Sequence, residues 1–137
     1  RFYPLDPSKR WEADLHALEA LIDSSTAGLL ICNPGNPTGQ NYSREHLKEL
    51  VALAERNRIP IIADEVYAGM VFEGEHFTSV AEVSCNVPVL SVGAVSKRWL
   101  APGWRCGWIV AHDRNSILTD AGVLEGLGRM QQITLGP

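Results

Sequence analysis

The sequence predicts an α/β protein whose sheet is mainly parallel and flanked by helices. Four short apolar runs, which we interpret as strands, occupy residues 28–32, 59–63, 87–92 and 107–111. These runs are continuously apolar rather than alternating, which is typical of strands covered on both faces. Amphipathic segments at helical spacing lie among them, and this order favours a parallel sheet with helices packed against it.

The predicted helices can be assigned from their caps and their apolar spacing. Asp14 is suited to cap the first helix, whose inward side chains are Leu15, Leu18, Leu21 and Ile22. Residues 33–39, which read NPGNPTG, form a dense turn signal directly after the first strand. Ser43 then opens a second helix, with inward side chains Leu47, Leu50, Val51 and Ala54. Residues 114–130 form the last predicted helix, which is weakened by Gly122, Gly126 and Gly128.

Composition limits the classes of partner. The 137 residues are enough for one domain with a core, and 45% hydrophobic and 20% charged residues fit an ordinary soluble globular protein. A net charge of -4 gives no reason to expect a nucleic acid or an anionic membrane surface as a partner. No apolar run approaches the roughly 18 residues that a membrane-spanning helix needs.

The cysteines and the chain ends support further expectations. Cys32, Cys85 and Cys106 are far apart and form no Cys-x-x-Cys pair, so we expect buried free thiols rather than disulfides or a zinc site. The four histidines show no ligand spacing, so no metal is predicted. Free thiols and the absence of a visible signal peptide favour the cytoplasm. The chain starts without Met and stops after Leu-Gly-Pro, so we expect an internal segment of a longer protein.

Polar side chains follow three of the predicted strands. Asn33 and Asn36 come after the first strand, Asp64 and Tyr67 after the second, and Lys97 after the third. In parallel sheets, ligands bind outside the carboxyl ends of the strands. We therefore expect one crevice to collect these side chains.

Asp64 and Glu65 allow more than one interpretation. A lone Asp after a strand is most often a helix cap or a loop residue. A nucleotide hydrolase would use the two carboxylates for magnesium and water, but it needs a Gly-x-x-x-x-Gly-Lys-Ser/Thr loop, which this sequence lacks. That alternative stays open for a longer protein, as does a non-catalytic binding protein that kept the fold.

Lys97 changes the balance between these interpretations. A partly buried amine near arginines loses its proton more readily and becomes a nucleophile toward a carbonyl. Together with Asp64 and Arg105, it forms the set of groups that pyridoxal phosphate requires. The carboxylate keeps the pyridine nitrogen protonated, the amine binds the aldehyde, and the guanidinium grips the phosphate in a bidentate fork.

Three segments carry a resemblance to a known family. They read NPGNPTG at 33–39, ADEVYAGMVF at 63–72 and SKRWLAPGWRCGW at 96–108. In this order and spacing they resemble the fold-type I, class I pyridoxal-phosphate aminotransferases, and the run 96–114 is especially similar to the tyrosine aminotransferases. The resemblance extends through nearly all 137 residues. It implies an incomplete internal segment, residues 1–137, of the family's large cofactor-binding domain, with parts missing on both sides.

The resemblance implies roles for five residues. Lys97 forms the internal aldimine with pyridoxal phosphate and shuttles the proton between the substrate α-carbon and the cofactor. Asp64 partners the pyridine nitrogen, and Arg105 binds the phosphate. Asn36 and Tyr67 hydrogen-bond the phenolic oxygen, which tunes the basicity of the imine.

The resemblance also implies an activity. It is the transamination of an aromatic, tyrosine-like L-amino acid with a 2-oxo acid acceptor, in a homodimer. Another aminotransferase or a carbon–sulfur lyase of the same fold remains an alternative, because the residues that contact substrate lie mostly outside this segment. The segment lacks the family's glycine-rich phosphate loop, its ring-stacking aromatic residue and its substrate-carboxylate arginine, so we expect the 137 residues alone to be inactive or nearly so.

Neighbouring positions receive structural interpretations. Ala94 stands where many relatives carry a phosphate-binding serine, which puts one phosphate contact in doubt. Asn33 is assigned to turn chemistry, and a cis bond before Pro37 is common in such turns. Glu65 is assigned as a structural ion-pair partner, and Arg98 either pairs with it or is solvated.

Overall fold

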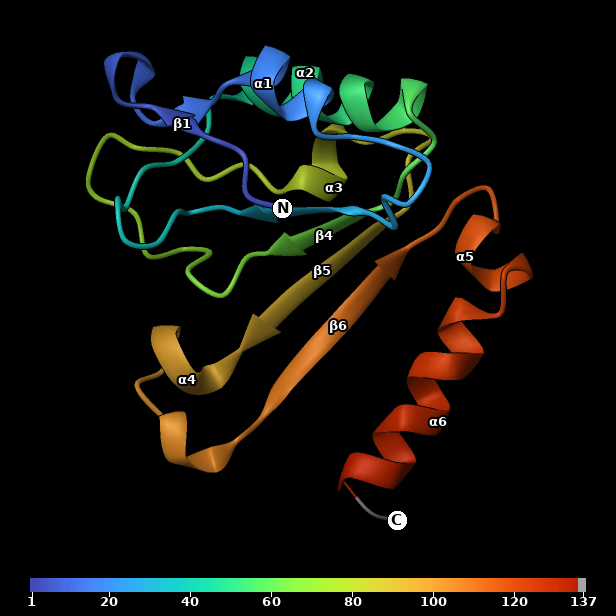
Figure 1. The fold of residues 1–137 in the computed structure, drawn as a ribbon. Helices are drawn as coiled ribbons and strands as arrows, with labels where there is room; N and C mark the ends of the chain where they lie inside the picture. The colour runs from blue at the N-terminus through green and yellow to red at the C-terminus, as the bar shows by residue number, and fades with distance from the viewer. Residues whose placement is uncertain (136–137) are drawn as a thin grey trace.

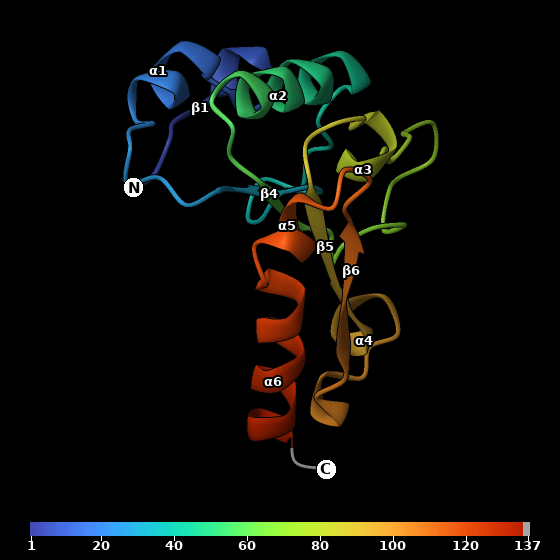
Figure 2. The same cartoon turned by 90° about the vertical axis from the view of Figure 1, so that its right-hand side faces the viewer.

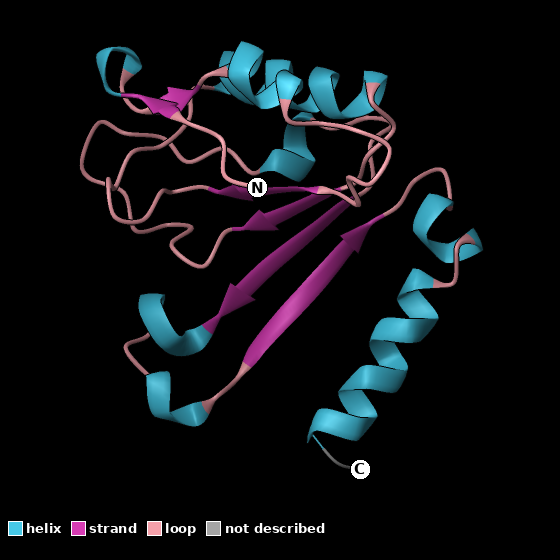
Figure 3. Ribbon diagram, viewed as in Figure 1, coloured by secondary structure: helices cyan, strands magenta, loops and turns pink. Residues whose placement is uncertain are grey.

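The computed structural model describes residues 1–135 and contains a four-stranded mixed sheet. Its strands lie side by side in the order β3 (Leu29–Cys32), β4 (Ile61–Asp64), β5 (Val89–Ala94) and β6 (Gly107–His112). The first three are parallel, and β6 runs antiparallel to β5 (Figures 1 and 3). The prediction of an α/β fold with a mainly parallel sheet is therefore confirmed.

Short elements and helices surround this sheet. A two-stranded antiparallel ribbon near the N-terminus joins β1 (Leu5–Asp6) to β2 (Glu12–Ala13) through the 3-10 turn η1 (Pro7–Lys9). The helices, with the 3-10 turn η2 (Pro102–Trp104), are α1 (Leu15–Ala20), α2 (Arg44–Arg56), α3 (Val80–Val83), α4 (Val95–Arg98), α5 (Ile117–Asp120) and α6 (Val123–Leu135). Across residues 1–135, none of these helices has both the length and the apolar character to cross a bilayer.

The two predicted helix caps are confirmed. Asp14 accepts a hydrogen bond from the backbone N–H of Ala17 at 3.0 Å, and Ser43 accepts one from the N–H of His46 at 3.2 Å. Each bond satisfies a backbone donor that the first turn of a helix leaves unpaired. The starts of α1 and α2 are thus determined by local sequence.

The hydrophobic core lies between the sheet and the helices α1, α2 and α3. In Figure 1, α1 and α2 lie together above the sheet. All four predicted inward side chains of α2 are buried, and Val80 of α3 joins them. The strands contribute alternate residues to this core, namely Leu29 and Ile31, Ile61 and Ala63, and Val89.

The opposite face of the sheet differs from the prediction. Leu30 of β3 is 57% exposed and Ile62 of β4 is 38% exposed, although both lie in continuously apolar runs. The expectation of strands covered on both faces is therefore wrong for β3 and β4 within residues 1–135, because these residues supply a helical layer for only one face of these two strands. It is also wrong for β6, all six residues of which are exposed. Helix α6 runs alongside β6 (Figure 2), and a cavity of about 700 Å³ lies between it and strands β5 and β6.

Strand and helix boundaries also shift from their predicted positions. Strands β4 and β5 begin just after Pro60 and Pro88, because proline has no N–H to donate to a sheet. The predicted single helix over 114–130 is two helices, since Gly122 adopts a positive φ of 72° and ends α5. Helix α6 then continues to Leu135 through the other two glycines.

Candidate active site

The five predicted site residues lie at or near one end of the sheet, the end where β3, β4 and β5 finish. Asn36 follows β3, Asp64 ends β4, and Lys97 lies in α4 directly after β5. Tyr67 is in the turn after β4. Because β6 is antiparallel, its first residue lies at the same edge as the last residues of β3 to β5, and Arg105 comes just before it. The topology thus gathers chain segments at this edge that lie up to 70 residues apart.

Lys97 and Tyr67 are brought close together. The Nζ atom of Lys97 lies 5.8 Å from the centroid of the Tyr67 ring. Lys97 is exposed and Tyr67 is half-buried. The turn that carries Tyr67 is closed by a hydrogen bond from the N–H of Met70 to the Tyr67 carbonyl, at 2.9 Å. An amine and a phenol therefore face the same space beyond the ends of β4 and β5.

Asp64 and Asn36 are connected through Cys32. Asp64 accepts a hydrogen bond from the N–H of Val66 at 3.1 Å, which orients its carboxylate. Cys32 is the residue opposite Asp64 in the pairing of β3 with β4. Burial raises the pKa of the Cys32 thiol and the Asp64 charge adds to this rise, whereas a hydrogen bond from the Asn36 backbone opposes it. Cys32 therefore lies beside the predicted site residue Asp64, which its sequence context did not reveal.

The three thiols should differ in reactivity. All three are free, but Cys85 and Cys106 are exposed, so the expectation of buried thiols is wrong for these two. Cys32 is partly buried and has a raised pKa, and both properties lower its supply of accessible thiolate. We expect iodoacetamide at pH 8 to modify Cys32 severalfold more slowly than the other two, as measured by timed quenching and peptide mass spectrometry. Equal rates would contradict this environment for Cys32.

Arg105 and Ala94 occupy the side of the site near β6. Arg105 has a positive φ of 50° and donates one hydrogen bond, from Nη1 to the carbonyl of Pro102 at 3.0 Å. The rest of its guanidinium is exposed and lines the cavity beside α6. Ala94 is the N-cap residue of α4 and provides no side-chain hydrogen bond there. Alanine at this position therefore lacks the hydroxyl that a serine would place at the start of α4.

Two of the predicted site residues line separate cavities in residues 1–135. Asn36 lines a cavity of about 700 Å³ beside β3 that also borders α1 and the N-terminal segment. Arg105 lines the cavity beside α6, and neither of these two cavities includes Asp64, Tyr67 or Lys97. The contact between Tyr67 and Lys97 is thus the part of the predicted constellation that the described structure assembles directly.

Glu65 has a different role from the predicted one. Its carboxylate oxygens accept the Ser79 hydroxyl at 2.9 and 3.0 Å, and one of them also accepts the N–H of Val80 at 2.9 Å. The interpretation of Glu65 as an ion-pair partner of Arg98 is wrong, because the carboxylate caps the start of α3 instead. A carboxylate engaged in this way is poorly placed to hold magnesium beside Asp64, which argues against the nucleotide-hydrolase alternative.

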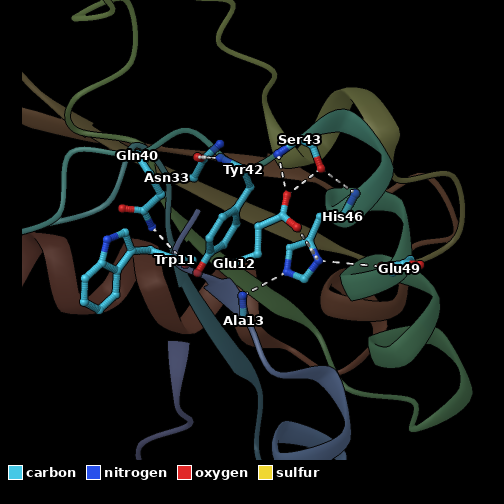
Figure 4. A network of polar contacts seen from close by, with 9 residues as sticks. All are labelled: Trp11, Glu12, Ala13, Asn33, Gln40, Tyr42, Ser43, His46 and Glu49. Atoms are coloured by element: carbon cyan, nitrogen blue, oxygen red, sulfur yellow. Dashed lines mark hydrogen bonds and ion pairs between the residues drawn. The ribbon is translucent and has the colours of Figure 1, made fainter. Parts of the chain in front are cut away.

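A polar network around the buried His46 holds the N-terminal ribbon on α2 (Figure 4). The Nε2 atom of His46 accepts the N–H of Ala13 at 3.1 Å, and its Nδ1 lies 3.7 Å from Glu12 and 3.6 Å from Glu49. Glu12 in turn accepts the Ser43 hydroxyl at 2.6 Å. Sequence reasoning missed this network, because its partners come from segments about 30 residues apart. The network therefore fixes the C-terminal end of the loop that precedes α2.

Known proteins share this fold and much of this sequence. A family model described as aminotransferase class I and II matches residues 1–135. The chain belongs to the aminotransferase class I and II family. The solved tyrosine aminotransferase from Leishmania infantum has a TM-score of 0.92 and 42% identity, with the match covering 96% of this chain and 32% of that one. The fold-type I resemblance inferred from the three motifs is confirmed.

Two relatives by sequence indicate how far this similarity reaches. Tyrosine aminotransferase from Mus musculus is 48% identical over 137 residues, and a cystine lyase from Arabidopsis thaliana is 37% identical over 137 residues. Each match covers 100% of this chain but only 30% and 32% of the relative. The chain therefore spans about a third of the length of these two relatives.

Proposed function

We propose that these residues form an internal segment of the large cofactor-binding domain of a pyridoxal-phosphate aminotransferase. Its substrates would be a tyrosine-like aromatic amino acid and a 2-oxo acid. The observation that carries this proposal is the approach of the Lys97 amine to the Tyr67 ring, 5.8 Å away, at the edge of the sheet that also presents Asp64. The identity of 48% to a tyrosine aminotransferase supports the aromatic substrate class.

The donors and acceptors present fit pyridoxal phosphate. Asp64 uses one carboxylate oxygen for the N–H of Val66, and a carboxylate has capacity to accept the proton-bearing pyridine nitrogen as well. Arg105 uses Nη1 for a backbone carbonyl, and a guanidinium has five N–H donors, so several remain for a phosphate. Lys97 is exposed, which leaves its amine accessible to an aldehyde.

The residues of this chain then have distinct tasks. Pyridoxal phosphate, when bound, supplies an aldehyde that accepts the amino group and a ring that delocalises the electrons left at the substrate α-carbon. Lys97 would hold the cofactor through Nζ, and once a substrate amine had taken its place, the freed Nζ would be positioned to move a proton from the substrate α-carbon to the cofactor. Asp64 would hold a proton at the pyridine nitrogen. Asn36 and Tyr67 would donate hydrogen bonds to the phenolic oxygen.

The test is to trap the cofactor on its lysine in the full-length protein. Pyridoxal phosphate is added, the visible spectrum is recorded, and borohydride reduction is followed by peptide mapping. We expect one modified lysine, Lys97, while Lys48, which is exposed on α2, stays unmodified as an internal control. A label spread over surface lysines, or the absence of a visible band, would count against the proposed site.

A carbon–sulfur lyase is the second candidate, and the 37% identity to a cystine lyase favours it over more distant alternatives. Both activities would use the same cofactor-binding residues. Transamination transfers the amino group of the substrate to a 2-oxo acid, whereas the lyase reaction breaks a carbon–sulfur bond of the substrate. Incubation with tyrosine and a 2-oxo acid, and separately with cystine, distinguishes them by the release of an aromatic 2-oxo acid or of a sulfur-containing product.

The assembly and location of the protein belong to the same proposal. The family resemblance supports a homodimer with active sites at the interface, and the free thiols support a cytoplasmic location. No nucleic acid or membrane partner is included. The 137 residues by themselves should show little or no transamination, because the chain spans about a third of its relatives' length.

A further inference from the structure

Asn33 is a fully buried polar side chain at the end of β3, with 0% of its surface exposed. Its Oδ1 accepts the N–H of Tyr42 at 2.9 Å (Figure 4), and its Nδ2 donates to the carbonyl of Thr78 at 3.2 Å. Its backbone N–H donates to the carbonyl of Asp64 at 3.0 Å. The assignment of Asn33 to turn chemistry alone is therefore too narrow, since two of its partners lie 31 and 45 residues away.

These hydrogen bonds join two loops. The Asn36 loop, residues 33–42, ends at the residue that donates to the Asn33 side-chain oxygen. The Tyr67 loop, residues 65–79, ends beside the carbonyl that accepts from the Asn33 side-chain nitrogen. One amide thus bonds the far ends of both loops, each of which carries a proposed ligand of the same cofactor oxygen.

Each loop is also closed on itself. In the Asn36 loop, the N–H of Gly35 donates to the carbonyl of Gln40 at 2.9 Å. In the Tyr67 loop, Glu65 at the start binds Ser79 and Val80 at the end. Because both loops are internally closed, fixing their ends to one side chain also restricts the residues between the ends.

We propose that Asn33 is a positioning residue that sets the separation of Asn36 and Tyr67, and this inference rests on the proposed function. The position requires a side chain that accepts a hydrogen bond from one loop and donates a hydrogen bond to the other, and a carboxamide does both. Burial keeps water from competing for these bonds, so loss of one of them leaves an unsatisfied group. Asn33 then acts on cofactor binding through the two residues that it holds.

The test uses Asn33→Asp in the full-length protein. Aspartate has the same shape and still accepts from Tyr42, but it cannot donate to the carbonyl of Thr78. Asn57→Asp is the matched control, because the Asn57 amide donates to the carbonyl of Leu53 at 2.9 Å at the end of α2, away from both loops. We expect Asn33→Asp to weaken binding of pyridoxal phosphate about tenfold, which is the effect of 1.4 kcal/mol, and the control to leave it unchanged.

A double-mutant cycle separates positioning from general support of the fold. If Asn33 acts through Asn36 and Tyr67, the effect of Asn33→Asp should largely disappear in the Asn36→Ala, Tyr67→Phe background. An equal loss of cofactor affinity in both backgrounds would overturn the proposal. Asn33→Ala, which removes both side-chain bonds without adding a charge, takes the place of Asn33→Asp if the aspartate variant does not fold.

Amide hydrogen exchange on the cofactor-free protein gives an independent readout. Asn33→Ala, which removes both side-chain bonds, should speed exchange in residues 34–42 and 66–78 together, whereas Asn57→Ala should affect only the end of α2. Faster exchange in only one loop, or in neither, would show that Asn33 does not couple them. If the unmodified protein fails to bind pyridoxal phosphate at Lys97, the proposed function fails, while the exchange result still decides whether the loops are coupled.

Discussion

Replacing Lys97 by alanine is expected to remove the trapped cofactor label and to lower kcat for transamination by at least about 10²- to 10⁴-fold, the usual contribution of one positioned base. The change removes the amine that attaches the cofactor and, with it, the group proposed to carry the α-proton. The side chain is exposed and lies at the end of a four-residue helix, so its loss should have little effect on folding. Turnover of a tyrosine-like amino acid with a 2-oxo acid by the full-length protein measures the effect.

Two controls make this result specific. Lys48→Ala removes an exposed lysine from α2, a helix that contributes none of the five site residues, and should leave both the label and the rate unchanged. Lys97→Arg keeps a positive charge but has no amine that can lose its proton near neutral pH, so it should be as impaired as the alanine variant. Near-normal turnover by either Lys97 variant would mean that another group carries the proton.

Replacing Leu50 by alanine is expected to lower the free energy of unfolding by about 2–5 kcal/mol. Leu50 is 0% exposed and lies in the middle of α2, on the side that faces β3 to β5. Its truncation leaves a cavity between the helix and the sheet, and close-packed neighbours fill such a cavity only in part. The midpoint of denaturant unfolding, followed by far-UV circular dichroism in the full-length protein, measures the loss.

The matched control for this substitution lies on the same helix. Lys48 is exposed, and its replacement by alanine should change the free energy of unfolding by no more than about 0.5 kcal/mol. Both substitutions introduce alanine, the residue with the highest helix propensity, so helix propensity cannot account for a difference in the free energy of unfolding between the two variants. Similar losses for the two variants would contradict the assignment of the core to this face of α2.

Much of the secondary structure follows from local sequence. The caps at Asp14 and Ser43 and the inward spacing of α2 are confirmed, because capping and amphipathic spacing depend on residues within one or two turns. The apolar runs predict which segments pair, although prolines move the exact strand starts. The three motifs identify the aminotransferase class I and II family, since residue types and spacing are themselves the signal. The roles of Lys97 and the other four site residues remain predictions.

Tertiary structure alone decided how these segments meet. The antiparallel direction of β6 brings Arg105 to the edge that carries Asp64, and no local pattern distinguishes a parallel strand from an antiparallel one at the end of a sheet. The partners of Asn33 and Glu65 lie 9 to 45 residues away, so turn chemistry and ion pairing were the local interpretations available for them. A buried hydrogen bond depends on which atoms folding brings within about 3 Å, and that distance is a property of the packed chain rather than of any short stretch of its sequence.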